Sequence, residues 1–143
     1  MLAIIDTKNM PLIKVEFRNC SDEDKKDQYF DNFLNEWTLL YSYGLEFMMV
    51  FDTRNLRLKP GDMRFVKKMA CFMDTLKTKP TLLRSSIIVV SSDIVEKFLN
   101  ILFSMNKPFS EVHVVGMKDF SNLRAIVRSH LKKHNIDCNK YER

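Results

Sequence analysis

The apolar residues of this chain form two kinds of pattern, continuous runs and helical repeats. Five consecutive apolar residues, 47–51, run directly into the polar residues Asp52–Asn55. A continuous apolar run that ends in polar turn residues is typical of a strand buried on both faces, inside a parallel sheet. Ser86–Val90 and Val112–Val115 repeat this pattern further along the chain. The sequence therefore predicts three buried strands at these positions.

The N-terminal segment predicts strands of another kind. Ala3–Thr7 and Leu12–Phe17 are short strand candidates, and the four residues between them are typical of a hairpin connection. In the second candidate, Lys14 and Glu16 alternate with apolar residues, so one face is charged and the other is apolar. The hairpin is expected to add an antiparallel edge to the sheet.

Between the strands, apolar residues recur at spacings of three and four, which is typical of amphipathic helices. The predicted helices cover about residues 21–43, 62–77, 93–105 and 120–134. Ser21 is expected to cap the first helix, and Gly44 to end it in the left-handed conformation. The element order is β-β-α-β-α-β-α-β-α. It predicts a single α/β domain over residues 1–143, with a mostly parallel, helix-covered sheet and a basic tail from about residue 135.

This order resembles the STAS domain, the fold of bacterial anti-sigma-factor antagonists and of transporter cytoplasmic domains. The resemblance covers about residues 1–134 and rests on the hairpin start, the FMMVFDTRNL strand exit and the short SIIVVSS strand. It implies a non-enzymatic regulatory protein that acts through protein–protein interaction. The antagonists carry a phosphorylatable serine before their second helix. The matching turn here, Leu58–Asp62, has no hydroxyl group, so no phosphorylation switch is expected there.

A second resemblance covers residues 87–116. The run from Ile87 to Gly116 is similar to the lipid-exchange core of CRAL-TRIO domains. In that core a strand leads to an apolar gate helix, which is followed by a Lys-Pro-Phe-like turn, here Lys107–Phe109. This resemblance implies the alternative function, a carrier of a lipid or of a small anion.

Polar residues follow each of the three predicted buried strands. They are Asp52, Thr53, Arg54, Asn55, Ser91, Ser92 and Lys118. Because the carboxyl ends of parallel strands lie at one edge of a sheet, we expect these residues to form a binding rim. Helix N-termini and cations together favour an anion such as phosphate or carboxylate. The alternative, that the same residues only cap helices and fill turns, stays open.

The predicted helix 93–105 is apolar around more of its circumference than a covering helix needs. Its partner or lipid face is predicted to consist of Ile94, Phe98, Leu102 and Met105. This surface could instead be core, and otherwise it would contact a partner protein, a second copy of the chain or a lipid. The sequence leaves these alternatives open.

No motif indicates catalysis, a cofactor or a metal. The chain has no P-loop, GxGxxG motif or nucleophile elbow, and Asp52 lacks the neighbouring acids that a phospho-acceptor needs to hold Mg²⁺. His113, His130 and His134 do not show the spacing of a ligand set. The net charge is +5. We interpret the basic side of helix 120–134 as a solvent-exposed face that does not bind nucleic acid.

The three cysteines lack ligand spacing and predict free thiols in a reducing, cytoplasmic compartment. No apolar run is long enough for a transmembrane segment.

Overall fold

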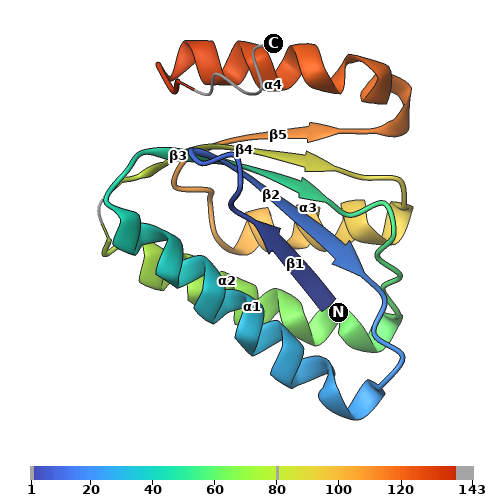
Figure 1. Cartoon of the computed structure of the whole chain (residues 1–143). Coiled ribbons are helices and arrows are strands. Elements are labelled where there is room, and N and C mark those ends of the chain that lie inside the picture. The colour runs from blue at the N-terminus through green and yellow to red at the C-terminus, as the bar shows by residue number, and fades with distance from the viewer. Residues whose placement is uncertain (1, 80, 138–143) are drawn as a thin grey trace.

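A five-stranded sheet forms the centre of the molecule (Figure 1). The computed structural model describes residues 2–79 and 81–137. The strands lie side by side in chain order: β1 (Leu2–Asp6), β2 (Leu12–Arg18), β3 (Phe47–Asp52), β4 (Leu83–Val89) and β5 (Glu111–Val115). β1 pairs with β2 in antiparallel fashion, and the other three neighbouring pairs are parallel. The predicted α/β class and the N-terminal hairpin are therefore confirmed.

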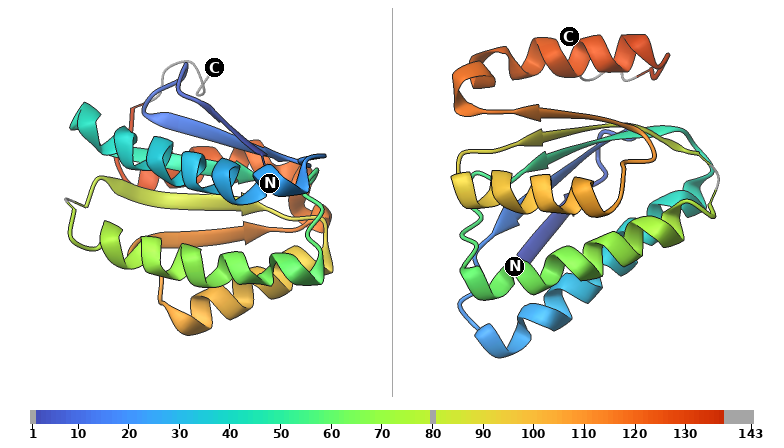
Figure 2. Two further views of the ribbon diagram at one scale, coloured as in Figure 1. Left: turned by 90° about the horizontal axis from the view of Figure 1, so that it is seen from below. Right: turned by 180° about the vertical axis from the view of Figure 1, so that it is seen from behind.

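Four α-helices cover the sheet unequally. They are α1 (Lys26–Leu40), α2 (Arg64–Leu76), α3 (Asp93–Met105) and α4 (Leu123–Lys133). Short 3-10 turns flank them: η1 (Glu23–Lys25), η2 (Tyr41–Tyr43), η3 (Pro60–Met63) and η4 (Met117–Asn122). Figures 1 and 2 show α1, α2 and α3 on one face of the sheet and α4 alone on the other. We call these sides the three-helix face and the one-helix face.

β3 lies in the middle of the sheet and is buried on both faces. Met49 and Phe51 belong to the core of the three-helix face, whereas Met48 and Val50 belong to the core of the one-helix face. Successive side chains of a strand point to opposite faces, so a continuous apolar run supplies both cores at once. The buried strand predicted from the apolar run 47–51 is therefore confirmed.

β5 is not the buried strand that its apolar sequence predicts. It lies at the sheet edge opposite β1, and only Val115 in it is fully buried. His113 and Val114 are exposed. An edge strand has a neighbour on one side only, so the three valines among its five residues do not ensure burial.

Several element boundaries differ from the prediction, and the contacts explain two of these differences. Asp22, not Ser21, caps the first helical segment, because its carboxylate accepts a hydrogen bond from the Asp24 backbone N–H at 3.1 Å. β4 begins at Leu83, since the buried residues Ser85 and Ser86 pair with both neighbouring strands. Gly44 adopts a φ of 67° at the end of η2, which confirms the predicted left-handed cap.

None of the helices in the described part of the chain is both long enough and apolar enough to cross a membrane. Cys20 and Cys71 are free thiols, and Cys71 is exposed. Cys138 and the end of the predicted basic tail lie outside the described residues. The cytoplasmic location stays a prediction.

Candidate functional site

The three-helix face contains an apolar cavity of about 120 Å³. Its walls come from the sheet, from α1, α2 and α3, and from the segments that follow β3 and α3. Thr53, Ser86 and Ser110 are the polar residues of its lining, and every other lining residue is apolar. The Thr53 hydroxyl donates a hydrogen bond to the Val89 carbonyl at 2.6 Å. The cavity is therefore suited to an uncharged apolar molecule.

α3 contributes one wall of this cavity. Its lining residues are Val95, Phe98, Leu99, Leu102 and Phe103. Phe98 and Leu102 are only 8% and 3% exposed and belong to the core, whereas Ile94 is half-buried and Met105 is exposed. Of the alternatives that the sequence left open, a core position therefore describes Phe98 and Leu102, and exposure describes Met105. The surplus apolar surface of α3 faces the cavity.

Several residues of the predicted rim contact one another at the carboxyl ends of β3 and β4. The Arg54 guanidinium donates a hydrogen bond to the Asp52 carboxylate at 2.8 Å and lies 4.2 Å from the centre of the Phe120 ring. The Ser91 hydroxyl donates to the Arg54 carbonyl at 3.3 Å. Hydrogen bonding from Arg54 holds the pKa of Asp52 below its usual value. Arg54 is thus already paired with an anion of this chain.

The remaining rim residues are more scattered in their roles. Thr53 is buried at the cavity wall. Ser92 is the N-cap residue of α3, but its side chain makes no capping hydrogen bond. Asn55 and Lys118 are exposed, the latter in η4. The structure brings Asp52, Arg54 and Ser91 together. Their polar groups form hydrogen bonds with one another, as the groups of a structural turn do.

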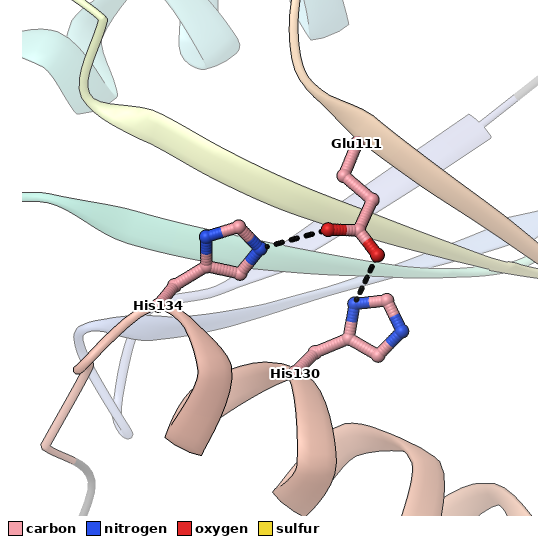
Figure 3. A group of neighbouring side chains, drawn as sticks. All are labelled: Glu111, His130 and His134. Atoms are coloured by element: carbon pink, nitrogen blue, oxygen red, sulfur yellow. Dashed lines mark hydrogen bonds and ion pairs between the residues drawn. The ribbon is translucent and has the colours of Figure 1, made fainter.

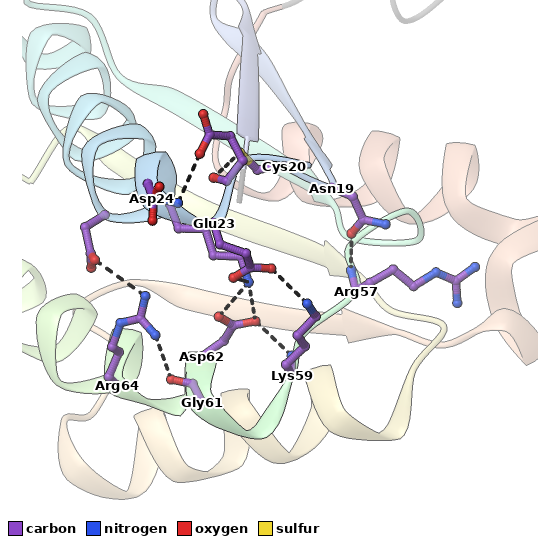
Figure 4. A network of polar contacts seen from close by, with 12 residues as sticks. Asn19, Cys20, Glu23, Asp24, Arg57, Lys59, Gly61, Asp62 and Arg64 are labelled. Atoms are coloured by element: carbon purple, nitrogen blue, oxygen red, sulfur yellow. Dashed lines mark hydrogen bonds and ion pairs between the residues drawn. The ribbon is translucent and has the colours of Figure 1, made fainter.

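A polar pocket of about 300 Å³ lies between the segments that follow β2 and β3. Figure 4 shows the network of polar contacts in this region. Lys26 and Asp62 form a buried ion pair there, with 3.0 Å between Nζ and Oδ1. Glu23 binds Lys26 at 2.9 Å and Lys59 at 2.8 Å. Hydrogen bonds from Lys59 and then Lys26 lower the pKa of Glu23 to about 2. This network ties the starts of α1 and α2 together.

Asp62 belongs to the turn Leu58–Asp62, which the STAS resemblance matches to the serine-bearing turn of the anti-sigma-factor antagonists. Here the Asp62 carboxylate also accepts a hydrogen bond from the Lys59 backbone N–H at 2.8 Å. Because both of its oxygens are engaged by this chain, a structural role accounts for Asp62.

A second polar cluster lies between β5 and α4 on the one-helix face (Figure 3). Glu111 of β5 points toward His130 of α4 and toward His134, the C-cap residue of α4 one turn later. Glu111 Oε2 is 3.1 Å from His134 Nε2, and Glu111 Oε1 is 3.7 Å from His130 Nδ1. His113 Nδ1 lies 3.2 Å from His130 Nε2. The fold therefore groups three histidines that the sequence spacing does not group.

The charges in this cluster follow from its surroundings. Burial lowers the pKa of His130, which favours a neutral ring at neutral pH. Hydrogen bonds from Lys133 and then His134 hold the pKa of Glu111 below its usual value. The Ser85 hydroxyl lies 2.7 Å from His130 Nδ1. We assign a hydrogen bond from this hydroxyl to Nδ1, with the ring proton on Nε2 facing His113.

Two patterns in the sequence carry the signal for this cluster. His130 and His134 are four residues apart, so they share one face of a helix. Glu111 and His113 are two residues apart, so they share one face of a strand. Neither pattern shows that α4 packs over β5. This packing is what brings the four residues together into one site.

No protein-family model matches this chain. The searches of curated proteins and of solved structures also find no significant match.

Proposed function

We propose that this chain is a non-enzymatic binding protein that holds a small apolar molecule in the cavity beneath α3. The observation that carries the proposal is the 120 Å³ cavity with its apolar lining. Protein cores are close-packed and leave few voids larger than a water molecule. The cavity is partly open to solvent, and a ligand that fills it would bury the apolar side chains of its lining. This burial would stabilise the folded protein.

The volume limits the class of ligand. Apolar cavities of about 150 Å³ stay dry and bind benzene or xenon. We therefore expect a molecule of roughly benzene size, or one end of a longer apolar chain, rather than a whole phospholipid. The CRAL-TRIO resemblance supports this choice, because its gate helix corresponds to α3. The Pro108 and Phe109 side chains of its turn also line the cavity.

The STAS resemblance supports a second part of the proposal, that the fold is STAS-like and serves regulation. The element order and the antiparallel first hairpin favour it. Binding of a partner protein or a second copy, which this resemblance implies, stays a prediction. In such a regulator, a ligand bound against α3 would be the signal that controls binding of the partner.

The test measures the melting temperature with benzene, toluene or indole, each near its solubility limit. We expect toluene to raise the melting temperature by about 2–4 °C, since about 1 kcal/mol of ligand stabilisation shifts a domain of this size by that amount. Val95→Phe adds volume to a cavity wall and should abolish the shift. Met105→Phe adds the same ring at an exposed position of the same helix and should keep it.

A second measurement covers the case in which Val95→Phe does not fold. Amide and methyl NMR spectra of the unaltered protein with toluene should change at Leu99, Leu102 and Ile88, which line the cavity. The proposal is wrong if none of the three probes shifts either the melting temperature or these signals.

A further inference from the structure

We propose that Glu111, His130 and His134 form a zinc-binding site on the one-helix face, with His113 as a positioning residue. The site is separate from the cavity beneath α3, and its existence does not depend on the proposed function. One carboxylate oxygen and one nitrogen from each imidazole lie within 4.8 Å of one another (Figure 3). Two imidazoles and one carboxylate are ligands that Zn²⁺ favours in proteins.

The distances match a single ion. Zn–N and Zn–O bonds of 2.0–2.2 Å in a tetrahedron place neighbouring ligand atoms about 3.3–3.6 Å apart. Glu111 Oε2 lies 3.1 Å from His134 Nε2, and the other carboxylate oxygen, Oε1, lies 3.7 Å from His130 Nδ1. Both lie within a few tenths of an ångström of that spacing. With one oxygen of Glu111, the three ligand atoms lie within 4.8 Å of one another. Small side-chain rotations of the two histidines would therefore bring all three atoms around one ion.

The backbone holds the three ligands in place before any ion binds. Glu111 lies on β5, whose parallel pairing with β4 fixes its direction. His130 lies on α4 and His134, four positions later, is the C-cap residue of this helix; this spacing directs both rings to one side. The buried residues Val127 and Leu131 anchor the same helix to the sheet. A site on rigid elements loses little conformational entropy when it binds.

The outer contacts of the cluster suit a metal ligand. His130 presents its second ring nitrogen, Nε2, to His113 Nδ1 at 3.2 Å. Hydrogen bonds to the distal nitrogen of a ligating histidine fix its tautomer and orientation. His113 is therefore expected to hold His130 with its Nδ1 lone pair available. The Ser85 hydroxyl, now 2.7 Å from Nδ1, would rotate away to admit the ion.

Lys133 is the group that competes with the metal. Its ammonium lies 2.9 Å and 3.1 Å from the two Glu111 oxygens. The Lys133 side chain is 62% exposed, and an exposed ion pair contributes only about 0–1 kcal/mol. The ion can displace it at little cost, so Lys133 tunes affinity without blocking the site. With three protein ligands, the fourth position of a tetrahedral ion is left for water or an external anion.

The experiment titrates Zn²⁺ into the full, metal-stripped chain by calorimetry and repeats the titration with variants. We expect Glu111→Gln, His130→Gln and His134→Gln each to weaken binding by more than the about 10- to 100-fold that loss of an outer-shell partner costs. His113→Gln should weaken it within that range. Lys133→Gln should tighten binding by up to about 5-fold, because the competing ion pair is gone.

Lys133→Gln distinguishes a zinc site that includes Glu111 from zinc binding by the two histidines alone. A helical histidine pair alone would bind Zn²⁺ with no response to Glu111→Gln or to Lys133→Gln, and that result overturns the proposal. Circular dichroism checks that each variant is folded. If buried His130→Gln unfolds, His134→Gln and Glu111→Gln decide the question.

Co²⁺ in place of Zn²⁺ reports the ligand type by its visible spectrum. Bands of a tetrahedral nitrogen–oxygen site support the proposal, and a thiolate charge-transfer band overturns it. No stoichiometric binding of either ion also overturns it.

Discussion

The two faces of the sheet use the same strands to build different interiors. On the three-helix face, β2 contributes Ile13, Val15 and Phe17, and the core is apolar from β2 to α3. On the one-helix face, the same strand contributes Leu12 to the core and then the charged residues Lys14 and Glu16. Apolar and charged side chains alternate along β2. The strand is therefore buried on the three-helix face and partly exposed on the one-helix face.

β5 repeats this lesson at the opposite edge. Val112 packs against the core of the three-helix face, whereas Glu111 and His113 lie on the other side with His130. The three-helix face therefore contains the apolar cavity, and the one-helix face contains the cluster of Glu111 and the histidines. The ligands that we propose differ accordingly, a small apolar molecule beneath α3 and a cation beneath α4.

The contrast between the two faces can be tested most directly at Phe98, an α3 side chain for which the sequence left open a core position and a partner or lipid contact. Phe98→Ala should lower the free energy of unfolding by about 3–5 kcal/mol, because it enlarges a cavity in the core. Urea unfolding measures the loss. Met105→Ala, on the exposed side of the same helix, should change it by less than about 0.5 kcal/mol.

Equal and small losses for the two variants would show that Phe98 is not core. The face predicted from the sequence would then be the correct description of α3, and the cavity would lose one wall.

The sequence predicted the fold well where a pattern has one structural solution. The run 47–51 became the central strand β3, and the predicted helix 93–105 coincides with α3. It failed at β5, because Val112–Val115 has the composition of a buried strand whichever position it takes in the sheet. Strand order is a tertiary property, and composition does not determine it.

The sites were harder to predict for a related reason. The rim residues Asp52 and Arg54 are two positions apart along the chain, so local spacing identified them, but their mutual ion pair was not visible. Glu111 and His130 belong to separate elements, and only the packing of α4 on β5 joins them. The cavity is a gap between side chains, and no sequence pattern encodes such a gap.

The polar face should respond to pH through His130. Burial, partly opposed by Glu111, lowers the pKa of His130 in the folded protein, and His113, Lys133 and His134 lower it further. The unfolded chain therefore binds the His130 proton more readily. Its stabilising contribution is complete above the unfolded pKa of about 6.5 and is lost as the pH falls toward the folded value.

Urea unfolding of the metal-free protein from pH 7.5 to 5 tests this expectation, with pH values set about the ordinary histidine pKa. His130→Gln should flatten the decline in stability, by at most the about 1.4 kcal/mol per pH unit that one proton allows. The carboxylate of Glu111, whose pKa is lowered, loses its contribution at more acidic pH and does not interfere. Parallel curves for the two proteins would contradict the burial of a neutral His130.

Arg54 should give the smallest effect, since its partners are partly exposed. Its ion pair with Asp52 and its stacking on Phe120 are each worth about 0.5–1 kcal/mol at such sites. Arg54→Ala should therefore cost about 1 kcal/mol in urea unfolding, and Arg54→Lys less, because it keeps the charge but loses the planar fork.

A double variant, Arg54→Ala with Lys118→Ala, decides whether the rim binds anions. Because Asp52 already neutralises Arg54, inorganic phosphate should shift the melting temperature of the parent protein and of the Arg54→Ala, Lys118→Ala double variant equally. Sodium chloride at matched ionic strength controls for general screening. A phosphate-specific stabilisation that the double variant loses would show that the rim releases Arg54 to an external anion. The binding site of this protein would then lie at the sheet edge, between the two faces, instead of within either one.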